Sequence, residues 1–126
     1  MTVSENLRLG KLVGGKPNKM NYERVFEFFP ILKERLNQVA GTLSGGQQQQ
    51  LAFGRILIGN PDIVLLDEPS EGIQPNIVQA IGEVIRRIRD AEGLTVIIVE
   101  QNLGLIQASA DRCVVIDKGT IIADIA

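Results

Sequence analysis

The sequence contains no histidine and no tryptophan, and Cys113 is its only cysteine. Without histidine, the commonest general base and a frequent metal ligand are missing, so any catalysis would depend on carboxylates. A single cysteine excludes an internal disulfide and most zinc sites, and the apolar run around Cys113 predicts a small core residue. These features fit a reducing compartment.

Runs of basic residues and long apolar runs are also missing. The 13 lysines and arginines stand against 15 acidic residues, for a net charge of −2. The chain thus lacks the electrostatic footprint of a protein that binds nucleic acid or anionic lipid. No segment reaches the roughly 18 apolar residues of a membrane span, and the first ten residues show no signal peptide. With 126 residues, 44% of them hydrophobic, the chain is long enough for a globular core.

The first 40 residues have a mostly helical pattern. They predict a short helix capped by Thr2 or Ser4, then a loop of glycine, lysine and proline over residues 10–19. A second helix is expected over residues 21–29, where Pro30 ends it.

After residue 60 the pattern becomes α/β. Residues 63–66 form an aliphatic run typical of a strand buried on both faces, and residues 95–99 predict a second buried strand. Between them, Pro75 and Gly93 bound a helix with apolar residues at helical spacing. A short helix over residues 102–108 and a hairpin around residues 117–119 are expected to follow.

Residues 43–55 read LSGGQQQQLAFGR, which predicts the start of a helix. Ser44 is a suitable N-cap, and Gln47 can reach back to it in a capping box. Gly45 and Gly46 then lie in the first turn and leave backbone N–H groups open to an anion such as a phosphate. A helix with a flexible, glutamine-rich first turn explains the same stretch equally well. The expected apolar face consists of Leu51, Ala52, Ile56 and Leu57.

The segment DIVLLDEP places Asp67 and Glu68 at the C-terminal end of a predicted strand, where ligands bind in open α/β sheets. In phosphoryl-transfer sites a strand-end Asp holds Mg²⁺ directly or through water, and a following Glu can accept a proton from the attacking water or orient it. A solvated turn between strand and helix is the structural alternative.

The motifs of the chain follow in the order LSGGQ, then a strand ending in DEP, then a strand ending at Glu100 and Gln101. In this order of motifs the chain closely resembles the ATP-binding subunits of ABC transporters. The resemblance runs nearly end to end. It implies an α/β fold, a partial nucleotide-binding core of the P-loop NTPase type with mainly parallel strands plus a helical subdomain. Residues 1–59 would be the helical subdomain, and residues 60–126 the C-terminal part of the core.

The resemblance also implies roles for individual residues. Asp67 would hold Mg²⁺ through water, and Glu68 would be the catalytic carboxylate. The signature motif would be Leu43, Ser44, Gly45, Gly46 and Gln47, and it would close over the ATP held by a partner subunit. The D-loop would be Ser70, Glu71, Gly72, Ile73 and Gln74.

The implied partners are a second ATP-binding subunit, in a homodimer or heterodimer, and transmembrane permease subunits. Through the permeases the protein would sit on the cytoplasmic, inner face of the cell membrane. The strings VEQN at 99–102 and EGIQP at 71–75 resemble importers for branched-chain amino acids or urea.

Two residues depart from the family pattern. Gln101 replaces the switch histidine; it can donate a hydrogen bond to a phosphate oxygen but cannot take a proton. A structural role for Gln101, capping the next helix, is the alternative. Gln74 replaces the usual aspartate of the D-loop.

The family's phosphate loop is missing from the sequence. The string GKLVGGK at residues 10–16 fits G-x-x-x-x-G-K, but Pro17 replaces the Ser or Thr that would ligate Mg²⁺, and no strand precedes it. The chain is therefore expected to be the second half of an ATPase subunit, inactive alone and prone to self-association. The alternatives are a non-catalytic module that docks on a transport complex and the C-terminal lobe of a chromosome or repair ATPase, although no heptad run precedes Ser44.

Overall fold

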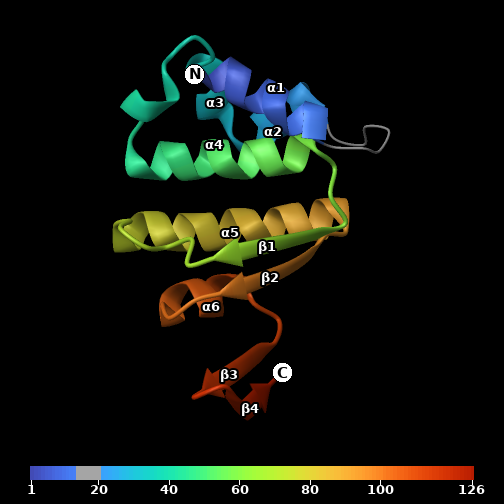
Figure 1. Ribbon diagram of the computed structural model, residues 1–126, viewed down its shortest axis with the longest axis vertical. Helices are drawn as coiled ribbons and strands as arrows, with labels where there is room; N and C mark the ends of the chain where they lie inside the picture. Colours follow the sequence, from blue (N-terminus) through green and yellow to red (C-terminus); the bar gives the residue numbers. More distant parts are fainter. Residues whose placement is uncertain (14–20) are drawn as a thin grey trace.

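The computed structural model describes residues 1–13 and 21–126. A helical part at the N-terminal end stacks on an α/β part, and a hairpin extends from the far end (Figure 1). The helical part consists of α1 (Val3–Val13), α2 (Tyr22–Phe28), α3 (Pro30–Glu34), the 3₁₀ turn η1 (Ala40–Thr42) and α4 (Gly45–Ile58). The rest consists of β1 (Ile63–Asp67), α5 (Pro75–Glu92), β2 (Thr95–Val99), α6 (Leu103–Ser109), β3 (Cys113–Asp117) and β4 (Thr120–Ile125). The fold is α/β, as expected.

Helix α1 begins at a capping box. The Thr2 hydroxyl accepts a hydrogen bond from the Glu5 N–H at 3.2 Å, and the Glu5 carboxylate accepts one from the Thr2 N–H at 2.9 Å. Thr2, rather than Ser4, is therefore the cap. The helix continues to Val13, so the loop predicted from Gly10 is wrong for residues 10–13. Residues 14–19 of that loop, and the end of the GKLVGGK string, lie outside the described residues.

Gly10 packs between two helices and does not form the predicted turn. It is buried against α4, and a Cβ atom there would lie 2.1 Å from the Arg55 carbonyl oxygen. Only glycine allows the two helix backbones to approach so closely.

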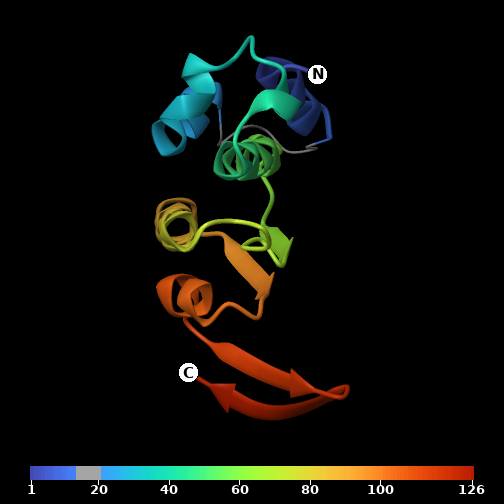
Figure 2. The same cartoon turned by 90° about the vertical axis from the view of Figure 1, so that its left-hand side faces the viewer.

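Helix α4 runs as predicted from Ser44 to Ile58, but it buries a broader face than expected. Leu51 and Leu57 are buried, whereas Ala52 and Ile56 are only partly buried. Residues that the apolar pattern left out complete the buried face, namely Gly46, Phe53, Gly54 and Ile58. The reason is that α4 lies between the other helices of the helical part and α5 (Figure 2).

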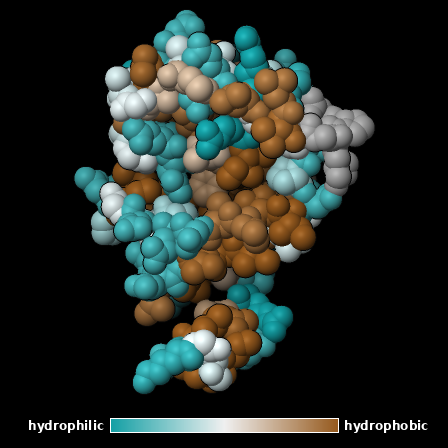
Figure 3. All heavy atoms as spheres, in the orientation of Figure 1, coloured by the Kyte–Doolittle hydropathy of each residue, from teal (hydrophilic) through white to brown (hydrophobic). Residues whose placement is uncertain are grey.

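Strands β1 and β2 pair in parallel, from Ile63 opposite Thr95 to Asp67 opposite Val99. Helices α5 and α6 both lie on one side of this pair (Figure 2). Val64 and Leu66 face that side and are buried. The prediction that strand 63–66 is buried on both faces is wrong, and β2 is not fully buried either, because the described residues place helices against one face only. The exposed aliphatic face consists of Ile63, Leu65, Ile97 and Val99, which are 52% to 71% exposed (Figure 3).

The predicted hairpin is confirmed. Strands β3 and β4 are antiparallel, and the turn between them has positive φ at Lys118 (49°) and Gly119 (77°). Cys113 begins β3 and is only partly buried, so it is not the core residue that its apolar neighbours suggested. The reason is that most of the hairpin is exposed, including Val114, Ile116 and Ile121.

Candidate functional site

The residues predicted to carry function lie along one edge of the molecule. The C-terminal ends of β1 and β2 and the N-terminal ends of α4 and α5 all point to the left in Figure 1. Parallel pairing in register makes the two strands end together, at Asp67 and Val99. The structure thus places the LSGGQ segment, the strand-end acids and the 70–74 loop on the same side.

The start of α4 has the predicted cap. The Ser44 hydroxyl accepts a hydrogen bond from the Gln47 N–H at 3.2 Å, and the Gln47 side chain accepts one from the Ser44 N–H at 3.1 Å. Ser44 and Gly45 are exposed, and Leu43 is buried beneath them. Within the described part of the chain, the N–H groups of Gly45 and Gly46 have no hydrogen-bond partner. An exposed, positive helix end is the kind of site where an anion binds.

Gly46 differs from Gly45 in its surroundings. It is buried, and a Cβ atom there would lie 3.0 Å from the Ile77 side chain of α5. Space around Gly45 is open, with nothing within 4 Å of such an atom. Gly45 thus lies open at the helix end, whereas the absence of a side chain at Gly46 allows the close contact between α4 and α5.

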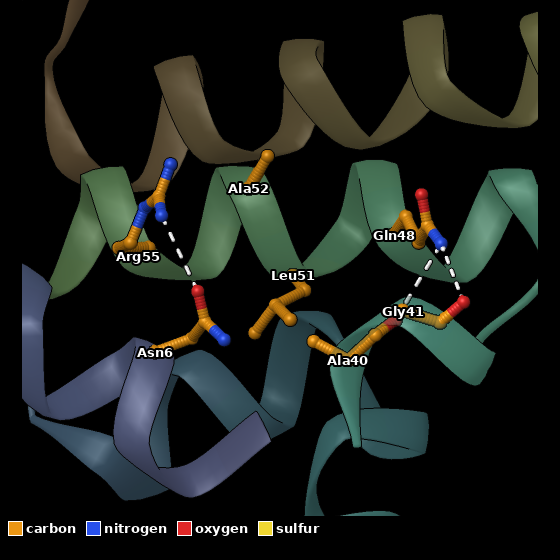
Figure 4. Close-up of a pocket in the computed structure, with 7 residues that line it drawn as sticks. All are labelled: Asn6, Ala40, Gly41, Gln48, Leu51, Ala52 and Arg55. Carbon is orange, nitrogen blue, oxygen red and sulfur yellow. Dashed lines mark hydrogen bonds between the residues drawn. The ribbon is translucent and has the colours of Figure 1, made fainter. Parts of the chain in front are cut away.

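Gln48 fixes the turn that precedes the signature segment. Its side-chain amide donates to the carbonyls of Ala40 (3.5 Å), Gly41 (3.4 Å) and Leu43 (3.3 Å). It lines a pocket of about 220 Å³ between α1, η1 and α4. Figure 4 shows Arg55 on the same pocket, donating to the Asn6 side chain at 3.3 Å. The pocket lies on the side of α4 away from α5, and its contacts hold the helical part together.

Asp67 and Glu68 are both exposed at the end of β1. The Glu68 N–H donates to the Val99 carbonyl at 2.8 Å, which extends the pairing of the strands by one residue. The negative charge of Glu71, followed by partial desolvation and the charges of Asp67 and Glu100, raises the pKa of Glu68. Crowded carboxylates of this kind favour a proton or a cation at the edge.

Glu100 is more firmly held than the other acids, and the sequence indicated it only as the end of a strand. Its carboxylate accepts hydrogen bonds from the backbone N–H groups of Ser70 (3.3 Å), Gln101 (3.0 Å) and Asn102 (3.1 Å). Burial acts to raise the pKa of Glu100, but the hydrogen bonds from the Ser70 side chain and these backbone groups outweigh it and lower the pKa. Glu100 therefore connects the loop after β1 to the loop after β2.

Gln101 is exposed directly after β2. The cap of α6 is Asn102, whose side chain accepts from the Leu105 N–H at 3.0 Å. The alternative interpretation of Gln101 as the capping residue is therefore wrong. Among the described residues, no hydrogen-bond partner holds its side chain.

The predicted D-loop joins β1 to α5 through consecutive turns. The Glu71 N–H donates to the Glu68 carbonyl at 3.1 Å, and the Ile73 N–H to the Ser70 carbonyl at 3.2 Å. Gly72 has φ of 72°, a conformation that favours glycine. Gln74 is exposed and precedes α5 without capping it through its side chain.

The donor set at this edge fits Mg²⁺ only in part. The described residues contain no group of three or more acidic, Cys or His residues arranged to hold a metal ion. Mg²⁺ in phosphate sites is often held by one or two carboxylates together with waters and substrate oxygens, and the exposed Asp67 suits that role. None of the described helices is long and apolar enough to cross a membrane.

Comparison with known proteins agrees with this arrangement. The family model described as ABC transporter matches residues 1–71. A high-affinity branched-chain amino acid transport ATP-binding protein of Pseudomonas aeruginosa is 47% identical over 123 residues, which are 97% of this chain and 52% of that protein. An arginine transport ATP-binding protein of Bacillus subtilis is 38% identical over 74% of this chain and 38% of its own length.

Among solved structures, the ADP conformation of an ATP-binding cassette of an ABC transporter superposes with a TM-score of 0.82. It is 31% identical, and the match covers 98% of this chain and 54% of that cassette. The chain spans about half the length of these relatives or less. By sequence and by fold, the chain belongs to the ABC transporter family and has the fold of part of its ATP-binding cassette.

Proposed function

We propose that the chain serves as part of the ATP-binding subunit of an importer, with branched-chain amino acids or urea as its solutes. The relative from Pseudomonas aeruginosa, which is named for branched-chain amino acid transport, supports the first solute class. The EGIQP string at 71–75 supports the second. The observation that carries the proposal is the exposed, capped start of α4 on the same edge as the strand-end carboxylates.

Each residue of this edge has a proposed task. Ser44, Gly46 and Gln47 bind the γ-phosphate of an ATP held by a partner subunit, with the positive end of α4 assisting. Asp67 holds Mg²⁺ through water. ATP with Mg²⁺ supplies the phosphoryl group that is transferred to water.

Glu68 accepts a proton from the attacking water or orients it. A carboxylate whose pKa is raised is a better general base near neutral pH than an ordinary one, so the crowding by Glu71 assists this role. Gln101 donates a hydrogen bond to a phosphate oxygen. It takes no proton, which leaves the base role to Glu68.

The 126-residue chain alone is proposed to be inactive. Its sequence has no G-x-x-x-x-G-K-[ST] loop to hold the β- and γ-phosphates. The proposed partners are a second ATP-binding subunit and the permease subunits, which would place it at the inner face of the membrane. The purified chain should show no steady ATPase rate, and a rate abolished by Glu68→Gln would contradict this.

The proposal is tested by pairing the chain with an intact ATP-binding subunit of the family, with and without MgATP. Pairing should require MgATP and should be lost in Ser44→Arg, which obstructs the start of α4. Ala91→Arg is the matched control, because Ala91 is exposed near the C-terminal end of α5, the end opposite to the proposed interface. Pairing that Ser44→Arg leaves unchanged would contradict the role of the signature segment.

A second candidate is a docking module without a catalytic role. The observation in its favour is the exposed aliphatic face of β1 and β2. Such a module would bind its partner through apolar burial, so binding would be independent of MgATP and would weaken in Leu65→Lys.

A further inference from the structure

Glu68 has an unusual backbone conformation. Its φ is 46°, in the left-handed region that residues with a side chain seldom adopt. Such a conformation persists only where the surrounding structure holds it in place. The contacts around Glu68 therefore determine where its carboxylate points.

Besides the turn bond from the Glu71 N–H to the Glu68 carbonyl, three hydrogen bonds with other parts of the chain hold the backbone around this residue. The Glu68 N–H donates to the Val99 carbonyl at 2.8 Å, and the Ser70 N–H donates to the Glu100 carboxylate at 3.3 Å. These partners are the last residue of β2 and the residue directly after it. The third bond comes from a different element: the Gln49 side-chain amide of α4 donates to the Pro69 carbonyl at 3.0 Å.

The bond from Gln49 is the only one of the three that crosses to the helical part. Gln49 is partly buried and lies four residues after Gly45, the first residue of α4. A shift of α4 would thus pull directly on the carbonyl next to Glu68. Proline has no N–H, so the carbonyl is the only backbone hydrogen-bonding group through which position 69 can be held.

We propose that Gln49 is a positioning residue, which holds the turn at Pro69 and so orients the Glu68 carboxylate relative to the start of α4. This inference rests on the proposed function for the catalytic role of Glu68. The hydrogen bond from Gln49, and its hold on the turn at Pro69, exist without nucleotide. Replacement of Gln49 should let the 68–74 loop relax, while α4 itself stays folded.

The test compares Gln49→Met with Gln50→Met in the full 126-residue chain, without nucleotide. Methionine keeps the length of glutamine but cannot donate. Gln50 is the matched control, because it neighbours Gln49 on α4 and the described residues give its side chain no hydrogen bond. Amide hydrogen exchange of residues 68–74 should become about fivefold faster in Gln49→Met, as expected for the loss of one hydrogen bond. Exchange within α4 should stay the same.

A second readout separates orientation from general stability. The Cα and Cβ chemical shifts of Glu68, followed by NMR, report its backbone conformation and should change in Gln49→Met, because the turn that holds its φ at 46° relaxes. Gln50→Met should match the unmodified chain in both readouts. Unchanged exchange and unchanged Glu68 chemical shifts in Gln49→Met would overturn the proposal, as would an even increase in exchange over the whole chain. Loss of MgATP-dependent pairing would instead bear on the proposed function alone.

Discussion

Glu68 shows how crowding of like charges sets the behaviour of one residue. Glu71, Asp67 and Glu100 all act on it, and the described residues provide no ion pair to it. Arginines that form ion pairs, such as Arg24, Arg89 and Arg112, pair with other carboxylates. At neutral pH the ionised Glu68 therefore lowers the stability of the folded chain. A residue with a functional role can carry such a cost.

We expect Glu68→Gln to raise the melting temperature at pH 7. The increase should be smaller than the change that a substitution in the hydrophobic core produces. Because the folded-state pKa is raised, Glu68 contributes fully to stability below its ordinary pKa of 4.5, and this contribution is lost as pH rises through the folded value. The advantage of Gln should therefore shrink as pH falls toward 4.5. Thermal unfolding at both pH values measures this, with Glu83→Gln on α5 as control. A lower melting temperature for Glu68→Gln at pH 7 would contradict the crowding.

The residues that the sequence could not identify are those whose partners are distant. Gln49 and Glu100 were visible only as part of a glutamine run and as a strand end. The bond that gives each its role joins backbone atoms 20 and 30 residues away, and no local pattern encodes such a contact. The roles of Ser44 and Asp67 came from family resemblance, not from periodicity.

The ends of helices could be predicted from residues close in the sequence, whereas the role of a glycine could not. Ser44, Pro75 and Gly93 marked the ends of α4 and α5, because caps and end residues act within a single turn. The turn predicted at Gly10 is wrong because a glycine serves equally in a turn or in a close contact between helices. The contact with Arg55, 45 positions later, decides between them.

Gly10→Ala should destabilise the fold by about 1–3 kcal/mol, because its Cβ would overlap the Arg55 carbonyl and force α1 away from α4. Urea unfolding gives the free energy. Gly41→Ala is the matched control, since nothing lies within 4 Å of a Cβ at Gly41. Equal stability of the two variants would show that α1 and α4 do not approach as described.

Ser44→Ala should cost about 1 kcal/mol of unfolding free energy, because it removes the hydrogen bond that the Gln47 N–H donates to the Ser44 hydroxyl. Ser44→Thr keeps a capping hydroxyl and should recover most of the loss. The same urea experiment measures both. An Ala variant as stable as the Thr variant would mean that the capping box is not maintained in solution.

For the whole molecule, the main feature is the open sheet face. The sequence predicted buried strands because an aliphatic run reports hydrophobicity but cannot show whether a second layer exists to cover it. Parallel sheets are normally covered on both faces. Four aliphatic side chains on β1 and β2 are instead more than half exposed.

We therefore expect the purified chain to self-associate through this face. Leu65, at 71% exposure, contributes much apolar surface without supporting the core, so Leu65→Lys should reduce association while leaving stability nearly unchanged. Light scattering over a concentration series measures the mass. The control is Leu12→Lys, at a residue that is 76% exposed on α1. A monomeric unmodified chain at every concentration would contradict this expectation.

The most direct test of the central claim, that the signature segment acts on a partner's ATP, is complementation. An intact subunit of the family with its own signature serine replaced by arginine is mixed with the chain, and ATP hydrolysis is measured. Hydrolysis should return with the unmodified chain and with Glu68→Gln, since the partner supplies its own carboxylate, but not with Ser44→Arg. If the chain pairs with that subunit and hydrolysis still does not return, or if Ser44→Arg restores it equally well, the claim is wrong.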